Sequence, residues 1–187
     1  SNPTLLINHH LESFNDFFDY GIFQVLKENN PIKISKNYNV KLSNATSSNV
    51  FFVRNKCLGG DVLSGNKQKV FQDNVEYDYI FWIDSDIVFK PEQVLYMIEK
   101  MENNKDLNIL SGLYLMEGGL EYTTVDKGDF TYNKFIKNGG SFPFIKKEEI
   151  ILKEGNDFEA DYTGFGFICI RNGVFDKLEY PWFKPIF

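Results

Sequence analysis

The stretch YDYIFWIDSDIVFKP, residues 77–91, decides the fold of this chain. Its first part, Tyr77–Ile83, is aromatic and β-branched throughout, which predicts a central buried strand. Asp84-Ser85-Asp86 follows directly, and Pro91 then stands at the first position of a predicted helix. A buried strand, two aspartates and a helix in this order indicate a ligand site at the carboxyl end of the strand.

The residues around this stretch alternate between strand and helix patterns. Apolar runs or alternation predict further strands at Thr4–Asn8, Ile32–Val40 and Asn108–Leu115. Helical spacing predicts one helix between Ser13 and Pro31 and another after the cap residues Ser47-Ser48-Asn49. The third helix begins at Pro91. We therefore expect an α/β fold, Rossmann-like, with a central, mostly parallel mixed sheet flanked by helices.

The pattern changes after residue 115. Gly118–Ser141 is rich in Gly, Tyr, Thr and Phe, which predicts hairpins and loops. Two further strands are predicted at Phe142–Lys153 and Phe158–Ile170, and a short helix at Gly173–Leu178. Because no linker or repeat interrupts the chain, we expect a single domain over 1–187. Its halves would be 1–115 and 116–187, the second hairpin-rich.

Composition excludes several classes of protein. The chain has 187 residues, a net charge of −6 and 17% aromatic residues. It lacks a basic run, which argues against nucleic acid as a partner. It also lacks an apolar run of the roughly 20 residues that a transmembrane helix needs. Cys57 and Cys169 form no disulfide framework, so we expect a reducing compartment, the cytoplasm.

Asp84 and Asp86 are the strongest chemical signal. Alternation in an extended chain would put both side chains on one side, roughly 6.6 Å apart. Oxygen ligands without nearby Cys or His favour Mg²⁺ or Mn²⁺ over Zn²⁺. A chain of this length contains about one Asp-x-Asp by chance. The signal therefore comes from its context at the end of a buried strand; the alternative is a pair of turn or helix-capping aspartates.

Four segments carry a resemblance to a known family. FWIDSDIVFKPEQVLYMIE resembles the metal-binding segment, with its DxD motif, of nucleotide-sugar-dependent glycosyltransferases of the GT-A fold. FFVRNKCL, ILSGLYL and DYTGFGFICIRNGVFDKLEYPWF are similar to the diphosphate-facing helix, the donor-sugar strand and the Gly-rich acceptor region of that family. The likeness is greatest to small glycosyltransferase domains encoded by large algal DNA viruses and by phages, so we expect a viral protein in the host cytoplasm.

The resemblance implies a metal-dependent transfer of a sugar from a nucleoside-diphosphate sugar to a glycan, glycoprotein or other hydroxyl acceptor. UDP is favoured by the resemblance alone, and GDP stays open. Mn²⁺ or Mg²⁺ would be bound by Asp84 and Asp86. The resemblance does not assign a base within this chain, but Asp157, Glu159 and Asp161 come just before the Gly-rich strand and would share one face of it. Of these, Asp161 is predicted to be the catalytic base, because it is nearest the glycines. The residues implied in binding the nucleotide are Asn8, His9, His10, Arg54, Asn55, Asp84 and Ser85. Those implied in binding the donor sugar or the acceptor are Gly112, Tyr114, Gly164, Phe165, Gly166 and Trp182.

Several of these residues have a structural interpretation as well. Arg54 could be a helix-surface residue, and the two histidines could be solvated. Glycines in a strand can mark a bulge. Trp182, with the aromatic residues beside it, could fill the core instead of forming an acceptor platform. Asp161 could cap a turn.

This chain departs from the family pattern at its end. Many GT-A enzymes place a third metal ligand, commonly His, after the Gly-rich segment, but no His follows His10 here. Either water and donor phosphate complete the metal's shell, or the ligand lies beyond Phe187 in a longer chain. The catalytic base could likewise lie beyond Phe187 in a longer chain.

Two other functions compete with glycosyl transfer. An aspartyl-phosphate phosphatase also places Asp-x-Asp after an apolar strand, with one Asp as nucleophile and one as acid and base. That class needs the motif on its first strand and a later metal loop, which residues 155–161 match only approximately. A non-catalytic carbohydrate-binding module would explain the aromatic content but has no use for a nucleotide-binding half.

Overall fold

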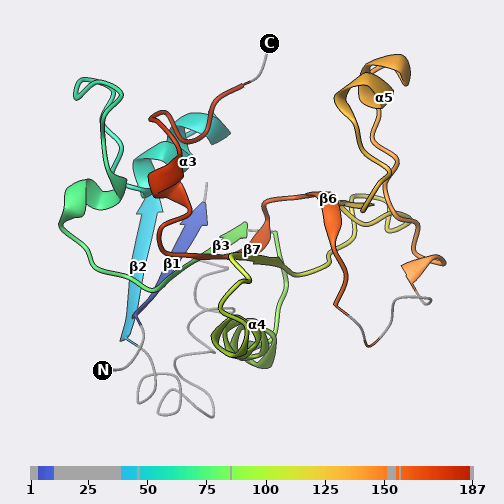
Figure 1. Ribbon diagram of the computed structural model, residues 1–187, viewed down its shortest axis with the longest axis horizontal. Coiled ribbons are helices and arrows are strands. Elements are labelled where there is room, and N and C mark those ends of the chain that lie inside the picture. Colours follow the sequence, from blue (N-terminus) through green and yellow to red (C-terminus); the bar gives the residue numbers. More distant parts are fainter. Residues whose placement is uncertain are drawn as a thin grey trace. The chain divides into compact units, whose positions relative to one another are not determined.

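The computed structural model describes residues 4–10, 39–45, 47–84, 86–150, 155 and 157–185. The chain forms two compact units (Figure 1). Unit 1 contains Ser1–Leu110 and Ile168–Phe187, and unit 2 contains Ser111–Phe167. The C-terminal residues therefore belong to the same unit as the first strands. The assignment of 1–115 and 116–187 to two functional halves stays a prediction.

Five strands form the main sheet, in the order β2-β1-β3-β7-β4. Their bounds are β1 Thr4–His10, β2 Asn39–Ala45, β3 Tyr79–Asp84, β4 Ile109–Ser111 and β7 Phe167–Arg171. The predicted α/β class is confirmed. The predicted helix between Ser13 and Pro31 lies outside the described residues, as does most of the strand predicted at Ile32–Val40.

The sheet is mixed in direction. β1 pairs in parallel with both β2 and β3. β7 is antiparallel to β4, because Arg171 N–H donates to the Asn108 carbonyl while Gly112 N–H donates to the Phe167 carbonyl. The end of β7 also lies beside the start of β3. The sheet is therefore mixed, as predicted, with parallel pairing shown for β2, β1 and β3 and antiparallel pairing for β7 with β4.

The core of unit 1 lies around β3. All five residues from Tyr79 to Ile83 are buried, as their apolar sequence predicts. Helix α4 (Pro91–Asn103) begins at its proline and buries one face, formed by Val94, Met97, Ile98 and Met101. Each such side chain contributes about 1.5–3 kcal/mol on burial. This packing fixes β3, and with it the position of the residues at its carboxyl end.

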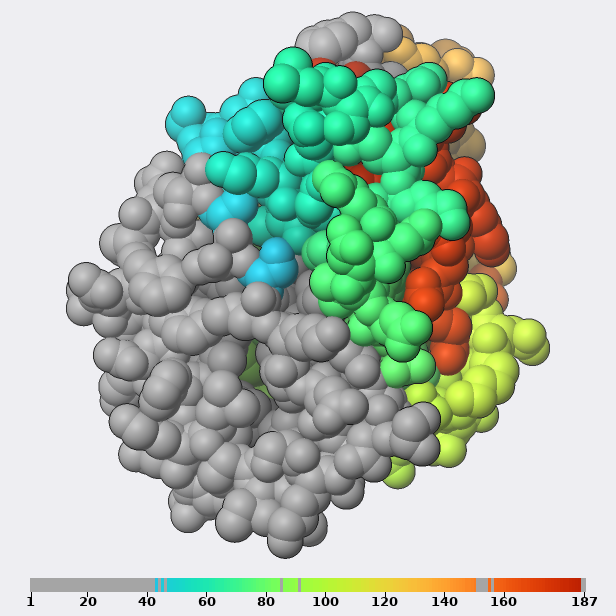
Figure 2. Space-filling model, turned by 90° about the vertical axis from the view of Figure 1, so that its left-hand side faces the viewer, coloured from blue at the N-terminus to red at the C-terminus, as the bar shows by residue number. Residues whose placement is uncertain are grey.

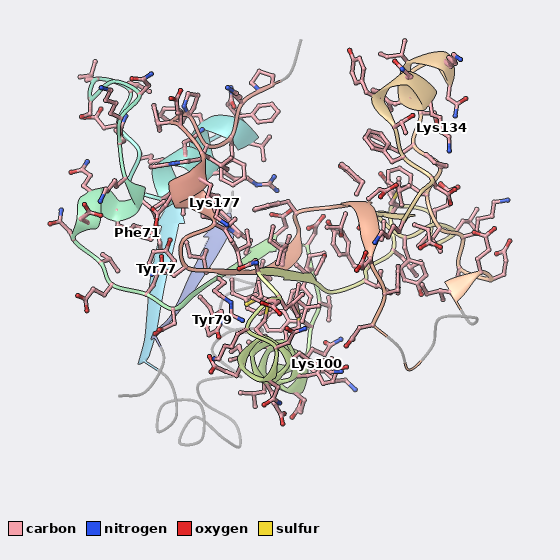
Figure 3. The ribbon with its side chains drawn as sticks, viewed as in Figure 1. Phe71, Tyr77, Tyr79, Lys100, Lys134 and Lys177 are labelled. Carbon is pink, nitrogen blue, oxygen red and sulfur yellow. The ribbon has the colours of Figure 1, made fainter. Side chains whose placement is uncertain are left out.

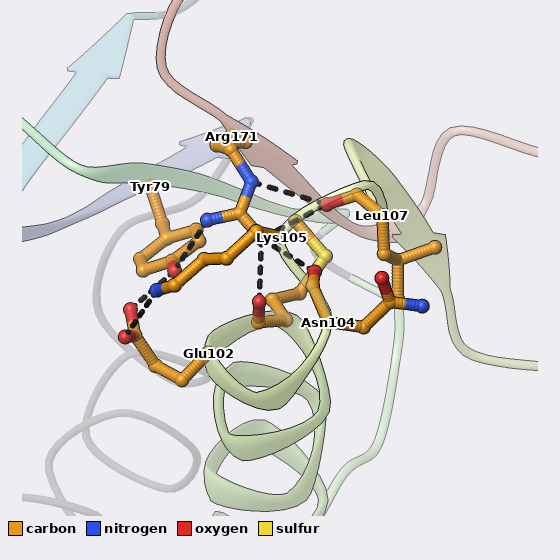
Figure 4. Close-up of polar contacts among 7 residues, drawn as sticks. Tyr79, Glu102, Asn104, Lys105, Leu107 and Arg171 are labelled. Carbon is orange, nitrogen blue, oxygen red and sulfur yellow. Dashed lines mark hydrogen bonds and ion pairs between the residues drawn. The ribbon is translucent and has the colours of Figure 1, made fainter.

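Arg171 ties the amino-terminal end of β3 to α4 (Figure 4). Its guanidinium donates to the carbonyls of Met101, Asn104 and Leu107 at 2.5–3.1 Å and to the Tyr79 hydroxyl at 2.9 Å. Tyr79 donates in turn to Glu102. Burial, and then this bond, raise the pKa of Tyr79, whereas the bond from Tyr79 lowers that of Glu102. The positive guanidinium thus donates to carbonyls at and just after the end of a helix, where intrahelical donors run out.

Helix α3 (Val50–Cys57) follows β2 after a short cap. The Asn49 side chain accepts from Phe52 N–H at 3.0 Å, as predicted for this cap. A connection then leads through the 3₁₀ helix η1 (Val70–Asp73) to β3. Phe71 N–H donates to Leu58 at 2.7 Å, and the Phe71 ring meets Tyr77 edge to face at 5.8 Å (Figure 3).

The C-terminal residues return to this connection. Tyr180 N–H donates to the Asn66 carbonyl at 3.3 Å. Figure 2 shows the connection, in green, with part of the red C-terminal stretch beside it. The predicted helix at Gly173–Leu178 is a shorter 3₁₀ helix, η3 (Phe175–Lys177), whose Phe175 is buried.

Unit 2 differs most from the predicted elements. Its two-stranded antiparallel sheet pairs β5 (Thr124–Asp126) with β6 (Ala160–Thr163), and helix α5 (Tyr132–Lys137) falls in a region predicted as hairpins and loops. The strand predicted at Phe142–Lys153 is wrong over 142–150, which holds only one isolated bridge, at Lys146. The long strand predicted at Phe158–Ile170 is instead two strands, β6 and β7, in different sheets.

Contacts between aromatic rings, and not a strand, surround Phe142. Phe142 lies 4.4 Å from Tyr162 and 5.3 Å from Phe130, centroid to centroid, in stacked geometry. Phe135 and Phe144 also contact Phe142, at 4.6 and 5.4 Å. Aromatic pairs at these separations contribute beyond their buried area. A cluster of rings therefore holds unit 2 together without a strand ladder at Phe142.

Candidate functional site

The carboxyl ends of three neighbouring strands meet at Asp84. His10 is the register partner of Asp84 in the β1–β3 ladder and of Ala45 in the β1–β2 ladder. Asn8 and His9 precede it within β1. The strand predicted at Thr4–Asn8 ends before the two histidines, whereas β1 runs through both. Open α/β sheets bind ligands at the carboxyl ends of their strands. Asn8, His9 and His10, which are predicted to bind the nucleotide, therefore lie at the edge of the sheet where such binding occurs.

Asp84 and Asp86 do not continue one extended strand. Asp84 is the last residue of β3, and Ile87 N–H donates to its carbonyl at 3.1 Å, which closes a turn. The argument from strand alternation was therefore wrong for Asp86. The Asp84 side chain is 35% exposed and Asp86 is exposed, so both carboxylates remain accessible to solvent. Ser85 lies outside the described residues.

Arg54 lies beside Asp84. A terminal nitrogen of its guanidinium is 3.4 Å from both carboxylate oxygens. The Arg54 side chain is 16% exposed, so it is not the helix-surface residue of the alternative interpretation. Its guanidinium also faces the Phe183 ring, 5.9 Å from the ring centroid. A cation from α3 and a carboxylate from β3 thus meet at the carboxyl end of the sheet.

Asn55 takes a structural position instead of the predicted one. It is 5% exposed, and its amide nitrogen donates to the carbonyls of Phe51 and Phe183, both at 2.7 Å. Phe183 N–H donates back to the Asn55 side-chain oxygen at 3.2 Å. Because both amide hydrogens are used, Asn55 has no donor left for a nucleotide. It fastens the C-terminal segment to α3.

Trp182 is a core residue, which corrects its prediction as an acceptor platform. It is 8% exposed and meets Tyr180 edge to face at 5.3 Å. A side chain at Gly60 would collide with the Tyr180 ring and lie tightly against that of Trp182. The C-terminal aromatics therefore pack closely against the end of α3, as the core interpretation of this segment proposed.

Tyr114 and the Gly-rich segment come together within unit 2. Gly166 N–H donates to the Tyr114 hydroxyl at 2.9 Å. A side chain at Gly164 would collide with that hydroxyl and with Thr123. Gly164 therefore allows the close approach of Tyr114, which explains this glycine without a sugar. Phe165, between them, is half-buried.

Gly112 also has a packing reason. Its N–H donates to the Phe167 carbonyl at 2.9 Å, and a Cβ at this position would overlap the Phe167 ring. The glycine is thus required where β4 meets β7. Its predicted contact with the donor sugar has no support from its surroundings.

Asp161 anchors a turn. One carboxylate oxygen accepts from Gly128 N–H at 2.7 Å and from Phe130 N–H at 2.9 Å. The neighbouring Glu159, predicted to share its strand face, precedes β6 and pairs with Lys127. The turn-capping interpretation therefore describes Asp161 better than the predicted role of catalytic base.

A pair of substitutions separates the two roles of Asp161. Asp161→Asn keeps an oxygen that can accept both bonds, so we expect sugar transfer and the turn to persist. Asp161→Ala removes the acceptor, and trypsin should then cleave faster after Lys127, which lies in that turn. A fall in transfer of about a hundredfold in Asp161→Asn, the low end for a general base, would contradict this and restore the catalytic role.

Burial of the two cysteines argues against a chemical role for them. Both are buried and free. Burial raises the pKa of Cys57 to about 11 and that of Cys169 to about 12. Each is therefore a protonated thiol at neutral pH, and a thiol is a poor nucleophile and metal ligand.

The donor atoms at the sheet edge suit a hard divalent cation. Asp84 and Asp86 offer carboxylate oxygens, which Mg²⁺ and Mn²⁺ prefer. Within the described ranges, no group of three or more His, Cys, Asp and Glu residues could hold a metal ion. An ion held by two carboxylates would complete its shell with water and phosphate oxygens, as Mg²⁺ usually does. The residues present therefore fit such an ion.

Comparison with protein families decides the class of the chain. The sequence model described as Glycosyl transferase family 2 matches residues 41–171, from within β2 to the last residue of β7. The chain belongs to glycosyl transferase family 2. No curated protein matches the sequence. The predicted class, a GT-A glycosyltransferase domain, is thereby confirmed.

Family membership also decides between the competing functions. A glycosyl transferase family 2 domain is an enzyme that transfers sugars, and neither a phosphatase nor a non-catalytic module is one. The matched range contains Arg54, Asp84 and Asp86. In the part of the chain that the structure describes, no helix has the length and apolar character that a membrane span needs.

The contact between Arg54 and Phe183 was missed from the sequence. Phe183 was grouped with a possible acceptor platform because it follows Trp182. Only the tertiary fold brings it to α3, and local patterning carries no signal for a contact between residues so far apart in the chain.

Proposed function

We propose that this glycosyltransferase transfers a sugar from a nucleoside-diphosphate sugar to a hydroxyl group of a glycan or similar acceptor, with Mn²⁺ or Mg²⁺ as cofactor. The contact of Arg54 with Asp84 at the carboxyl end of β3 carries the proposal. It puts a planar cation and a carboxylate side by side at the edge where α/β sheets bind nucleotides. UDP is the favoured nucleotide, on the strength of the sequence resemblance.

Each charged group has a task in this mechanism. Asp84 and Asp86 would hold the metal ion, which neutralises negative charge on the diphosphate. Arg54 donates hydrogen bonds to phosphate oxygens in the planar geometry that suits them. The hydrogen bonds from Arg54 strengthen as the sugar departs, because the leaving diphosphate gains charge in the transition state. Arg54 and the Asp pair thus favour the departure of the sugar.

The remaining predicted contacts complete the donor site. Asn8, His9 and His10 at the end of β1 are proposed to face the nucleoside, since His10 is in register with Asp84. Ser85 is proposed to contact the donor between the two aspartates. On the acceptor side, Phe165 is the residue we retain, because stacking on an aromatic ring needs no hydrogen bond of its own.

Titration of nucleoside diphosphates tests the donor site. We expect UDP to bind, and to raise the melting temperature, in the presence of Mn²⁺ but only weakly without it. Arg54→Lys should weaken UDP binding, since a point charge cannot reproduce a planar contact. Arg54→Ala should weaken it further, by about tenfold or more.

Lys56→Ala is the matched control. Lys56 is an exposed basic residue of the same helix, so its loss removes the same charge without touching the site. Equal UDP affinity in the parent and both Arg54 variants would reject the proposed contact. Binding of GDP in preference to UDP would change the nucleotide but retain the mechanism.

A further inference from the structure

The Phe183 ring lies at the centre of a small group in unit 1. It meets Trp82 of β3 edge to face at 5.4 Å and Phe175 of η3 at 5.9 Å. Its third neighbour is the Arg54 guanidinium, at 5.9 Å. The ring is therefore in contact with the strand that ends in Asp84 and with the cation beside Asp84.

The backbone of Phe183 is fixed as well. The Asn55 amide donates to its carbonyl at 2.7 Å and accepts from its N–H at 3.2 Å. Asn55 follows Arg54 directly in α3. One side chain thus binds both polar backbone groups of Phe183 and holds the ring against the neighbouring arginine.

We propose that Phe183 is a positioning residue for donor binding. The inference rests on the proposed function, in which Arg54 binds the diphosphate. A free arginine side chain loses much rotamer freedom when it is ordered. An aromatic ring attracts a guanidinium through its negative face, most strongly where water is excluded. With Arg54 largely buried, Phe183 holds the guanidinium at the sheet edge before the donor arrives, and preorganisation of this kind strengthens binding.

The direct test replaces the ring but keeps an apolar side chain. Phe183→Leu should weaken Mn²⁺-dependent UDP binding by about three- to tenfold, the range expected for a lost cation–π contact. Phe183→Tyr keeps the ring and should restore the parental affinity. Phe183→Met, whose flexible side chain fills irregular space, is a second ring-free variant should Phe183→Leu fold poorly.

Phe175→Leu is the matched control. Phe175 is buried and its ring packs against the Phe183 ring, whereas the Arg54 guanidinium faces Phe183. We expect it to lower the melting temperature with little change in UDP affinity. Equal loss of affinity in Phe175→Leu and Phe183→Leu would mean that general packing is responsible, and would overturn the inference.

A double-mutant cycle shows whether Phe183 acts through Arg54. In the Arg54→Ala background, Phe183→Leu should cause no further loss of UDP affinity, because the residue that it positions is gone. The same loss in both backgrounds would overturn the inference. If Arg54→Ala itself binds UDP like the parent, the proposed diphosphate contact fails. If Arg54→Ala weakens binding and Phe183→Leu does not, only the role of Phe183 fails.

Discussion

Substituting Asp84 with Asn is expected to abolish Mn²⁺-dependent binding of UDP and to lower sugar transfer by at least about a hundredfold. Asn keeps the size of the side chain and an oxygen that can accept from Arg54, but removes the negative charge that would hold the cation. Asp86→Asn should have a similar effect on metal dependence. Because Asp86 is exposed in a turn, its loss should leave the melting temperature unchanged.

Asp106→Asn controls for the chemical change. Asp106 is an exposed aspartate in the loop after α4, away from the end of β3. Calorimetric titration with UDP, with and without Mn²⁺, should give parental behaviour for this variant. If Asp84→Asn and Asp86→Asn both retain Mn²⁺-dependent affinity, the aspartate pair does not bind the cofactor.

The elements nearest to Asp84 were predictable because their signals are local. The run from Tyr79 to Ile83 is apolar without a break, which fits a strand covered on both faces. Pro91 and Asn49 mark the starts of α4 and α3 by their own chemistry. In each case neighbours along the chain determine the outcome, so no knowledge of the tertiary fold was needed.

Unit 2 shows where local signals fail. Phe142 and its neighbours are residue types that favour strands. Here their rings pack against one another, and Phe142 is not part of a strand ladder. Gly164 and Gly166 were included in one long strand, whereas the chain breaks there into β6 and β7. Helix α5 is short and rich in aromatic and β-branched residues; its clearest signal is the Thr131 cap, which accepts from Lys134.

The candidate site was predicted in part for a similar reason. The position of Asp84 follows from the strand that it ends, and Arg54 follows from its helix and the resemblance. The partners of Asn55 and Trp182 are decided by tertiary contacts with a segment far along the chain. A sequence pattern can identify a polar or aromatic residue. It does not show whether other residues of the folded protein already occupy the hydrogen-bonding groups and the surface of that side chain.

Replacing Arg171 is expected to have the largest effect on stability. Arg171→Ala removes the guanidinium donors to the carbonyls of Met101, Asn104 and Leu107, of which Asn104 keeps the bond from Leu107 N–H. Hydrogen bonds that involve a charged group contribute about 1.5–3 kcal/mol each. Since several are lost together, the free energy of unfolding in urea should fall by about 3 kcal/mol or more.

The matched control and the position of Arg171 make this result specific. Lys105→Ala removes a nearby exposed ion pair with Glu102 and should lower the free energy of unfolding by less than about 1 kcal/mol. Arg171→Lys should resemble Arg171→Ala, because one ammonium cannot reach three carbonyls and the Tyr79 hydroxyl at once.

Tyr79 begins β3 and Asp84 ends it, so the Arg171 variants should bind UDP with near-parental affinity while folded. A variant that stays fully stable would show that the carbonyls find other partners, and one that is stable but fails to bind UDP would connect Arg171 to the donor site.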